Sequence, residues 1–275
     1  MPELPEVETV MRGLDARLTG HVITRASLHR PDLRWPIPPE LPKTLTGARV
    51  QGFRRRGKFL LMRLDRGVSV LIHLGMSGRM IFDAPPAKHE HLTLEMDDAT
   101  RLGFVDPRRF GALDLIATSA EDTHKLLSAM GPEPLGNEFS GPVLAAALRG
   151  KITTIKAALL DQGIVAGIGN IYASEALFRA KISPRRLAGS LSRPAAERLA
   201  TAVKETLRDA IAAGGSSLRD YVQPNGELGY FQHAWKVYGR AGEPCERCPG
   251  AAECTGIKQI VQAGRSTFYC PKTQK

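Results

Sequence analysis

Proline at position 2 is the first residue of this sequence whose type and place suggest chemistry. Removal of an initiator Met before a small residue would leave Pro2 with a free secondary amine. An α-amino group titrates near about 8 and a Lys side chain near about 10.4, so a useful fraction of the amine is unprotonated at neutral pH. Such an amine can attack an aldehyde carbon to form a Schiff base, with Glu3 transferring protons. On these two residues alone, a simple lead-in to a helix is the more common arrangement.

The overall charge points to a polyanionic partner. Lys and Arg number 38 against 28 Asp and Glu in 275 residues, which gives a net charge of +10. Nucleic acid is the usual partner of such a chain, although a basic protein without a charged partner is the alternative. No apolar run approaches the roughly 18 residues of a membrane span. Because the N-terminus carries Glu3, Glu6 and Glu8, it does not resemble a signal peptide, and we expect a cytoplasmic protein that binds no membrane.

The chain is long enough for more than one domain and predicts an α+β multidomain protein. Residues 5–19 have the apolar stripe of a helix, with Pro5 in the first turn. Short segments between residues 22 and 118 predict the strands of a β-sandwich or barrel, at 22–29, 59–65, 68–75, 79–82, 91–97, 101–106 and 112–117. A Pro- and Gly-rich linker is expected near 131–139. Helices are expected at 142–149, 153–161, 170–180 and 194–213. We therefore predict a β-rich domain (1–133), a helical domain (134–239) and a small hairpin tail (240–275).

Six motifs, in order along the chain, resemble those of one family. They are MPELPEVETV (1–10), RRRGKFLL (54–61), HLGMSG (73–78), DPRRFG (106–111), GIGNIYASEALF (167–178) and GRSTFYC (264–270). Together they resemble the formamidopyrimidine-DNA glycosylase family over nearly the full length. The resemblance implies a monomeric bacterial DNA-repair enzyme that works at the nucleoid on double-stranded DNA. It would remove oxidised purines (8-oxoguanine and formamidopyrimidines) and then cleave the abasic site by β- and δ-elimination.

The resemblance also assigns the catalytic residues. Pro2 would be the nucleophile and Glu3 its acid–base partner, while Lys58 would lie near the lesion and assist departure of the base. Glu6, one helical turn after Glu3, would contact the lesion pocket. On sequence alone, Glu6 could instead only stabilise the positive end of the helix dipole.

A polar, Gly-rich stretch at 214–230 is expected to form a loop over the everted base. We place Ser216, Ser217 and Tyr221 in the lesion pocket on the resemblance alone, because no physical argument assigns them.

Two turns in the strand region would fill the gap that an extruded base leaves in the duplex. Met76 and Phe110 match the family's intercalating residues, and Arg108 would read the orphaned cytosine. Without the resemblance, Met76 and Phe110 would more often be core residues at strand ends.

The helical domain resembles the family's helix–two-turn–helix element. The resemblance implies phosphate contacts by Lys156, Asn170, Tyr172 and Arg265, with a plain helical hairpin as the alternative. We expect Glu175 to pack or cap within this element. His89 and His91 should share one face of a strand, and a surface or DNA-backbone role for His89 is favoured over a metal pair.

All four cysteines lie in the tail. Cys245 and Cys248 form a Cys-x-x-Cys pair and Cys270 follows an aromatic strand, but Thr273 stands where the family has its fourth cysteine. Fifteen residues separate Cys254 from Cys270, close to the family's hairpin spacing. Because a four-cysteine Zn²⁺ site does not depend on ligand order, we hypothesise that Cys254 supplies the fourth thiolate of one structural zinc. The alternative is an empty or three-coordinate site.

Two rival functions remain on sequence evidence. One is the sister glycosylase that acts on oxidised pyrimidines. The other is a zinc-finger protein that binds damaged DNA without any chemistry.

Overall fold

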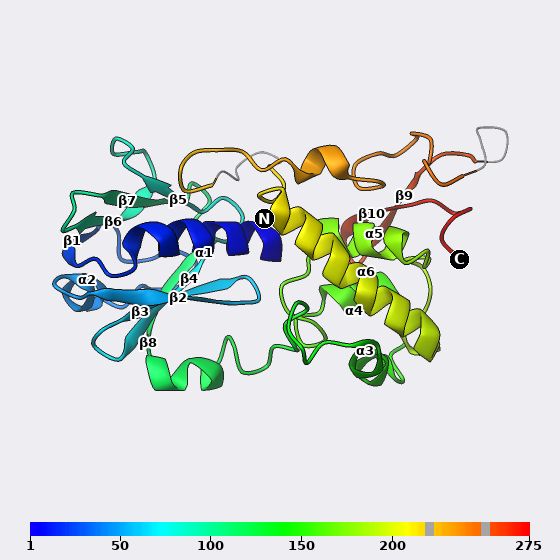
Figure 1. Cartoon of the computed structure of the whole chain (residues 1–275), viewed down its shortest axis with the longest axis horizontal. Coiled ribbons are helices and arrows are strands. Elements are labelled where there is room, and N and C mark those ends of the chain that lie inside the picture. The colour runs from blue at the N-terminus through cyan, green and yellow to red at the C-terminus, as the bar shows by residue number, and fades with distance from the viewer. Residues whose placement is uncertain (218–222, 249–253) are drawn as a thin grey trace. The chain divides into compact units, whose positions relative to one another are not determined.

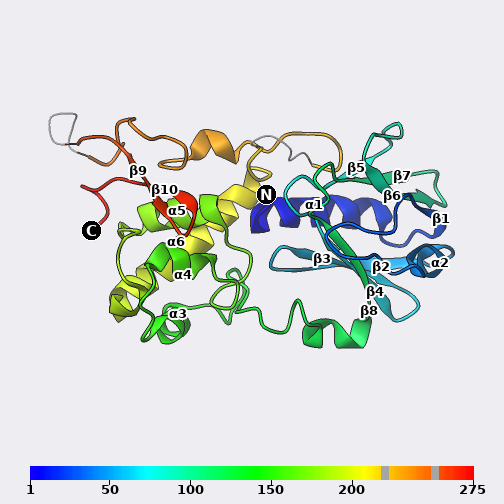
Figure 2. The same ribbon diagram turned by 180° about the vertical axis from the view of Figure 1, so that it is seen from behind.

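The computed structural model describes residues 1–217, 223–248 and 254–275. The chain forms two compact units, which we describe separately (Figures 1 and 2). The first contains Met1–Ser128 and Ile211–Gln232, and the second contains Ala129–Ala210 and His233–Lys275. The predicted division at residues 133 and 239 remains a prediction. Among the residues described, no helix is both long and apolar enough to cross a membrane.

The first unit begins with helix α1 (Leu4–Leu18). Pro5 occupies its first turn, where a missing N–H costs nothing. Val7, Val10 and Leu14 recur at helical spacing and are all buried against the core. This apolar face fixes the N-terminal segment of the chain on the sheets.

Two antiparallel four-stranded sheets make up the rest of this unit. The first has the order β1 (Ile23–Leu28), β6 (Glu90–Met96), β7 (Arg101–Val105) and β5 (Arg79–Phe82). The second has the order β2 (Val50–Arg56), β3 (Phe59–Leu64), β4 (Val68–His73) and β8 (Ala112–Ala117). Short helices α2 (Leu41–Leu45) and η1 (Thr118–Thr123) flank them. One apolar cluster draws on α1 and both sheets, as in a β-sandwich with a covering helix.

Strand β2 was not among the predicted strands. Its sequence, VQGFRRR, ends in three consecutive arginines and lacks the alternation of apolar and polar residues that marks a half-buried strand. Pairing with the strongly apolar β3 imposes the strand conformation. Tertiary pairing therefore overrides a weak local pattern.

The second unit is helical, with a small β-hairpin. Ser140 and Thr154 cap α3 and α4 by accepting hydrogen bonds from backbone N–H groups. Its elements, in chain order, are α3 (Gly141–Leu148), α4 (Ile155–Leu160), α5 (Asn170–Arg179), η2 (Ala188–Ser190), α6 (Arg193–Ala212), η3 (Phe231–Ala234), β9 (Lys258–Gln262) and β10 (Arg265–Tyr269). The predicted helices and the tail hairpin are thus confirmed, with ends that shift by one or two residues.

Candidate active site and nucleic-acid interface

The Glu6 carboxylate organises the N-terminal segment. Its Oε2 accepts the backbone N–H of Glu3 at 2.8 Å, and its Oε1 accepts that of Ser216 at 2.8 Å. Pro2 and Glu3 are themselves buried. Glu6 therefore joins the backbone of Glu3, which follows Pro2, to that of Ser216, which lies 210 positions beyond Glu6 in the sequence.

The segment 214–217 approaches this carboxylate closely. A Cβ added to Gly215 would lie 2.9 Å from Glu6 Oε1. The φ of Gly215 is +82°, a value that glycine adopts readily. Ser217 Oγ accepts the Gly229 N–H at 2.8 Å, so its side chain holds the returning chain. Tyr221, the other residue predicted in the pocket, lies outside the described residues.

Lys58 lies in the two-residue turn between β2 and β3, because Arg56 pairs with Phe59 across the turn. Gly57 precedes it with φ of +55°. The Lys58 side chain is largely buried, which restricts the positions its ammonium group can take.

His73 lies beside Lys58, and sequence reasoning did not single it out. Burial, followed by the positive charge of Lys58, lowers the pKa of His73 to about 4. Its Nδ1 lies 3.1 Å from the Gly75 backbone N–H, so the proton of the neutral ring resides on Nε2. The ring also packs on Phe59, with centroids 4.8 Å apart. The sequence feature that could have identified His73 is its position as the first residue of the HLGMSG motif.

Met76, Arg108 and Phe110 are presented at the surface by two neighbouring turns. Met76 is 37% exposed and Phe110 is 43% exposed. Neither is therefore a core residue at a strand end, which was the alternative on sequence alone. The Arg108 guanidinium carbon lies 4.9 Å from the centroid of the Phe110 ring. The two turns touch, because a Cβ on Gly75 would lie 2.4 Å from the Phe110 carbonyl carbon.

A fully buried carboxylate, Asp106, joins these turns. It accepts the Ser77 hydroxyl at 2.6 Å and the Gly111 N–H at 2.8 Å. The Ser77 hydroxyl oxygen in turn accepts the Arg108 backbone N–H at 3.1 Å. Sequence reasoning missed Asp106 and Ser77, although both fall inside the motifs that it quoted.

The prediction that His89 and His91 share a strand face is wrong. β6 begins at Glu90, and His89 precedes it in the left-handed region with φ of +67°. His91 is buried, and its Nε2 lies 2.8 Å from the Asp106 carbonyl oxygen. An irregularity in the pairing between Glu90 and Leu92 breaks the alternation on which the prediction relied.

In the second unit, Lys156 and Asn170 meet the C-terminal hairpin. The Lys156 ammonium is fully buried and lies 2.5 Å from Asn170 Oδ1 and 2.7 Å from Thr267 Oγ1. Both Lys156 and the Asn170 amide also donate to the Ser266 carbonyl oxygen, at 3.0 and 2.9 Å. These bonds join α4, the start of α5 and β10, next to the exposed Arg265. Tyr172 is only 1% exposed and packs within the helical core.

Glu175 caps a loop that lies outside the helix–two-turn–helix element, whereas we expected its contacts to fall within that element. Its carboxylate accepts the backbone N–H groups of Lys236, Val237 and Tyr238 at 2.8–3.0 Å. Burial raises the pKa of Glu175, while these N–H groups favour its ionised form. The bonds place the Tyr238 hydroxyl 3.5 Å from the Asn170 amide nitrogen.

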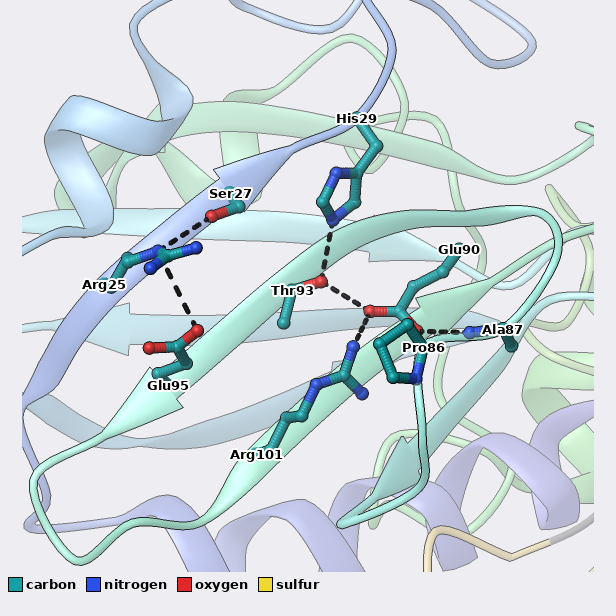
Figure 3. A pocket seen from close by; sticks show the side chains of 9 residues that line it. All are labelled: Arg25, Ser27, His29, Pro86, Ala87, Glu90, Thr93, Glu95 and Arg101. Carbon is teal, nitrogen blue, oxygen red and sulfur yellow. Dashed lines mark hydrogen bonds and ion pairs between the residues drawn. The ribbon is translucent and has the colours of Figure 1, made fainter.

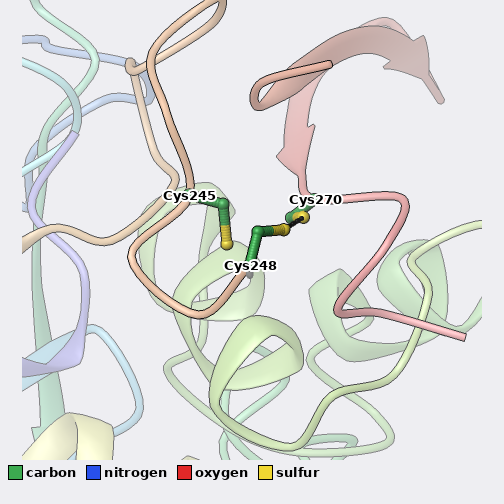
Figure 4. Close-up of side chains that lie close together, drawn as sticks. All are labelled: Cys245, Cys248 and Cys270. Carbon is green, nitrogen blue, oxygen red and sulfur yellow. Dashed lines mark hydrogen bonds between the residues drawn. The ribbon is translucent and has the colours of Figure 1, made fainter. Parts of the chain in front are cut away.

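Three cysteine sulfurs lie within 4.8 Å of one another: those of Cys245, Cys248 and Cys270 (Figure 4). The Thr273 hydroxyl is 3.5 Å from the Cys245 sulfur and 3.7 Å from the Cys248 sulfur. Cys254 packs against the apolar cluster that contains Cys245 and Cys270, but its sulfur is outside the group of three that lie within 4.8 Å of one another. All four cysteines are free thiols.

Known proteins match this chain from end to end. The Formamidopyrimidine-DNA glycosylase N-terminal domain family matches residues 1–113, and the Formamidopyrimidine-DNA glycosylase H2TH domain family matches residues 130–222. The formamidopyrimidine-DNA glycosylase of Acidiphilium cryptum is 69% identical over the full length of both chains, and that of a Ruegeria species is 55% identical, again over both full lengths. The chain belongs to the formamidopyrimidine-DNA glycosylase family.

Solved structures of family members share the fold. A complex of Lactococcus lactis Fpg with DNA that contains an abasic site superposes with a TM-score of 0.89 at 38% identity, over 99% of each chain. A MutM complex with DNA containing carbocyclic 8-oxo-G gives a TM-score of 0.89 at 38% identity over both full chains. The α+β fold with a helix–two-turn–helix region is thereby confirmed.

A separate pocket of about 300 Å³ lies over β1, β6 and β7 (Figure 3). Its charged groups are matched within the pocket: Arg25 pairs with Glu95, and Arg101 pairs with Glu90. It contains none of the residues that we predicted for the family's chemistry. Its lining comprises Arg25, Ser27, His29, Pro86, Ala87, Glu90, Thr93, Glu95 and Arg101.

Proposed function

We propose that this DNA glycosylase excises oxidised purines through a Schiff base on Pro2 and then cleaves the abasic site. The observation that carries the proposal is the buried N-terminal site, in which Glu6 ties the backbone of Glu3 to that of Ser216. A free N-terminal amine would then lie between an ionisable carboxyl group and a segment that can contact a base. Removal of Met1 is required, because an acylated Pro2 nitrogen has no nucleophilic lone pair.

The chemistry follows from the amine. Its lone pair attacks the sugar C1′, the C1′–N bond breaks, and the base departs with a proton that Glu3 or a neighbouring acid supplies. The nitrogen lone pair of the resulting aminal then breaks the C1′–O4′ bond, O4′ takes up a proton, and an open-chain iminium ion forms that acidifies the C2′ hydrogens. Loss of one of these expels the 3′-phosphate, and a second elimination expels the 5′-phosphate. Lys58, confined in its turn, would stabilise negative charge at the lesion phosphate.

The exposed side chains of Met76 and Phe110 support the insertion of an apolar wedge into the gap left by the extruded base. Arg108, held over the Phe110 ring, would donate hydrogen bonds to the orphaned cytosine. His89 in its turn would lie along the DNA backbone. In the second unit, Asn170 and Arg265 would hold phosphates around the lesion, and buried Lys156 would support them by orienting Asn170. The Tyr172 side chain is buried in the helical core, so we no longer assign it a phosphate contact.

Borohydride trapping on a duplex with 8-oxoguanine opposite cytosine tests this proposal. The wild-type protein should give a covalent protein–DNA complex, and Pro2→Gly, whose N-terminal amine is primary and outside the fixed geometry of the proline ring, should give far less. Intact mass should show the loss of one Met in both proteins. A wild-type protein that binds the duplex but forms no complex would be a non-catalytic damage binder.

Oxidised pyrimidines are the second candidate substrate class. A solved Lactococcus lactis relative, 38% identical to this chain, is a complex with oxidised pyrimidine-containing DNA. We expect excision of 8-oxoguanine to be faster than excision of thymine glycol under single-turnover conditions. The reverse order would assign the protein to the pyrimidine-specific activity.

The cysteine cluster fits one structural Zn²⁺. Four sulfurs in a tetrahedron at about 2.3 Å from zinc lie about 3.8 Å from one another, which three of these sulfurs already approach. Thr273 faces the cluster, but a threonine hydroxyl is not among the usual zinc ligands. We propose that Cys254, which packs against the same apolar cluster, completes the site with Cys245, Cys248 and Cys270.

Metal content and cobalt spectra test this ligand set without any enzyme assay. The wild-type protein should bind one zinc per chain, and its Co²⁺ form should show the intense thiolate-to-metal bands of four sulfur ligands. Cys254→Ser should weaken these bands and lower zinc retention, and Thr273→Cys in that background should restore both. Unchanged spectra and zinc content in Cys254→Ser would exclude Cys254 as a ligand.

A further inference from the structure

An ion pair in the first unit connects the two segments to which the catalytic residues belong. Arg55 Nε donates to Glu8 Oε2 at 2.8 Å. The Arg55 side chain is 9% exposed and that of Glu8 is 14% exposed. The pair is therefore largely shielded from solvent, unlike most surface pairs, which contribute little.

The same guanidinium makes a second bond. Arg55 Nη1 donates to the Gly57 carbonyl oxygen at 3.0 Å. This carbonyl belongs to the peptide bond that leads into Lys58. Glu8 lies on α1, whose first turn follows Pro2 and Glu3. One side chain thus contacts both the helix that begins at the proposed nucleophile and the turn that carries the proposed assisting lysine.

The arginine type fits this task. A planar guanidinium has several donors at fixed angles, so two of them can bind two acceptors with little freedom between them. A lysine at this position has a single flexible ammonium and would hold the two acceptors less rigidly. Glu8 also accepts a bond from Arg12 at 3.0 Å, but Arg12 is 62% exposed and contacts only α1 in this pair.

We propose that the Arg55–Glu8 pair is a positioning clamp that sets Lys58 relative to the N-terminal amine. The inference rests on the proposed function of Pro2 and Lys58. Small displacements of reacting groups can cost about 100-fold in rate, so a clamp of this kind would act on catalysis more than on DNA affinity.

The neighbouring residue provides a matched control. Arg54 is adjacent on β2 and also forms ion pairs, but it bonds Glu121 and Asp122 of η1 at 2.9 and 2.6 Å. Successive residues of a strand point to opposite faces, so Arg54 stabilises another part of the fold. Substituting either arginine removes one positive charge from the same strand.

The experiment compares Arg55→Met with Arg54→Met and includes Glu8→Gln as a milder variant. Single-turnover excision of 8-oxoguanine should fall by about tenfold to 100-fold in Arg55→Met. The Kd for a duplex with an uncleavable abasic analogue should change by less than about threefold, because neither Arg55 nor Glu8 is expected to contact DNA. Arg54→Met should keep the wild-type excision rate, and its Tm should be comparable to that of Arg55→Met. Glu8→Gln and Arg55→Lys should fall between Arg55→Met and wild type.

Equal excision rates in Arg55→Met and Arg54→Met would overturn the clamp, as would a rate loss that follows Tm across all four variants. Glu8→Ala combined with Arg55→Met should be no slower than Arg55→Met alone, because both changes break one unit. Failure of the proposed function is a different result: the wild-type protein itself would then show no Pro2-dependent borohydride trapping. The clamp is rejected only by the comparison of variants.

Discussion

At the scale of single residues, sequence motifs identified the exposed side chains but not the buried ones that hold them. Met76, Arg108 and Phe110 could be predicted because they fall in motifs that resemble a family. Asp106 and Ser77 fall in the same motifs, but their contact could not be predicted, because a hydrogen bond across 29 residues leaves no local pattern. Burial of a carboxylate with its acceptor sites satisfied by Ser77 and Gly111 is visible only in three dimensions.

Asp106→Ala should therefore disorder the intercalating turns. It leaves the buried Ser77 hydroxyl and Gly111 N–H without their acceptor, which costs about 1–3 kcal/mol for each unsatisfied group. We expect a lower Tm and roughly tenfold weaker binding of lesion-containing duplex, measured by fluorescence anisotropy. Asp97→Ala is the control, because Asp97 is 41% exposed and its carboxylate forms a surface ion pair with His21. Equal affinity in the two variants would contradict this role for Asp106.

At the scale of elements, periodicity predicted α1, the four longer helices and most strands, because each buries an apolar stripe. It failed at β2, whose arginines hide the strand pattern, and at the His89 turn, where a left-handed residue ends the alternation. Periodicity also could not predict contacts between elements that are distant in the sequence. The capping of the 236–238 loop by Glu175 joins residues more than 60 positions apart.

Glu175→Gln should loosen that loop. A glutamine amide has one acceptor oxygen instead of two, and its NH₂ group would face backbone N–H donors. We expect the free energy of unfolding to fall by about 1–3 kcal/mol. Because Tyr238 is then released from Asn170, affinity for abasic-site duplex should fall as well, as measured by titration calorimetry. Glu205→Gln is the control, since Glu205 is 52% exposed and forms only a 3.5 Å pair with Arg179.

At the scale of the whole molecule, the excess of 38 basic over 28 acidic residues was sufficient to predict a polyanionic partner. It did not show which cations are already neutralised within the protein. Arg54 and Arg63 both donate to Glu121, at 2.9 and 2.6 Å, and so are engaged in the fold. Arg63 makes a second bond through its Nε, at 2.9 Å, and the Ser69 hydroxyl donates a further one, at 2.7 Å, to the same buried carboxylate.

This carboxylate should make the protein sensitive to acid. Burial alone would raise the pKa of Glu121, but hydrogen bonds from Arg63, Ser69 and Arg54 overcome that effect and lower it to about 2. Since the folded pKa lies below the unfolded value of 4.5, the unfolded chain binds the proton first as pH falls. The stabilisation is complete above about pH 4.5 and is lost as pH falls towards 2. We expect the free energy of unfolding to fall by about 2 kcal/mol over this range, a value discounted because both guanidinium groups are about a third exposed.

Urea unfolding at several pH values should show this dependence of the free energy of unfolding on pH in the wild-type protein, and a shallower slope in Glu121→Gln. Asp122→Asn should retain the wild-type slope, because Asp122 is 74% exposed, and a parallel loss of slope in both variants would rule out Glu121 as the source.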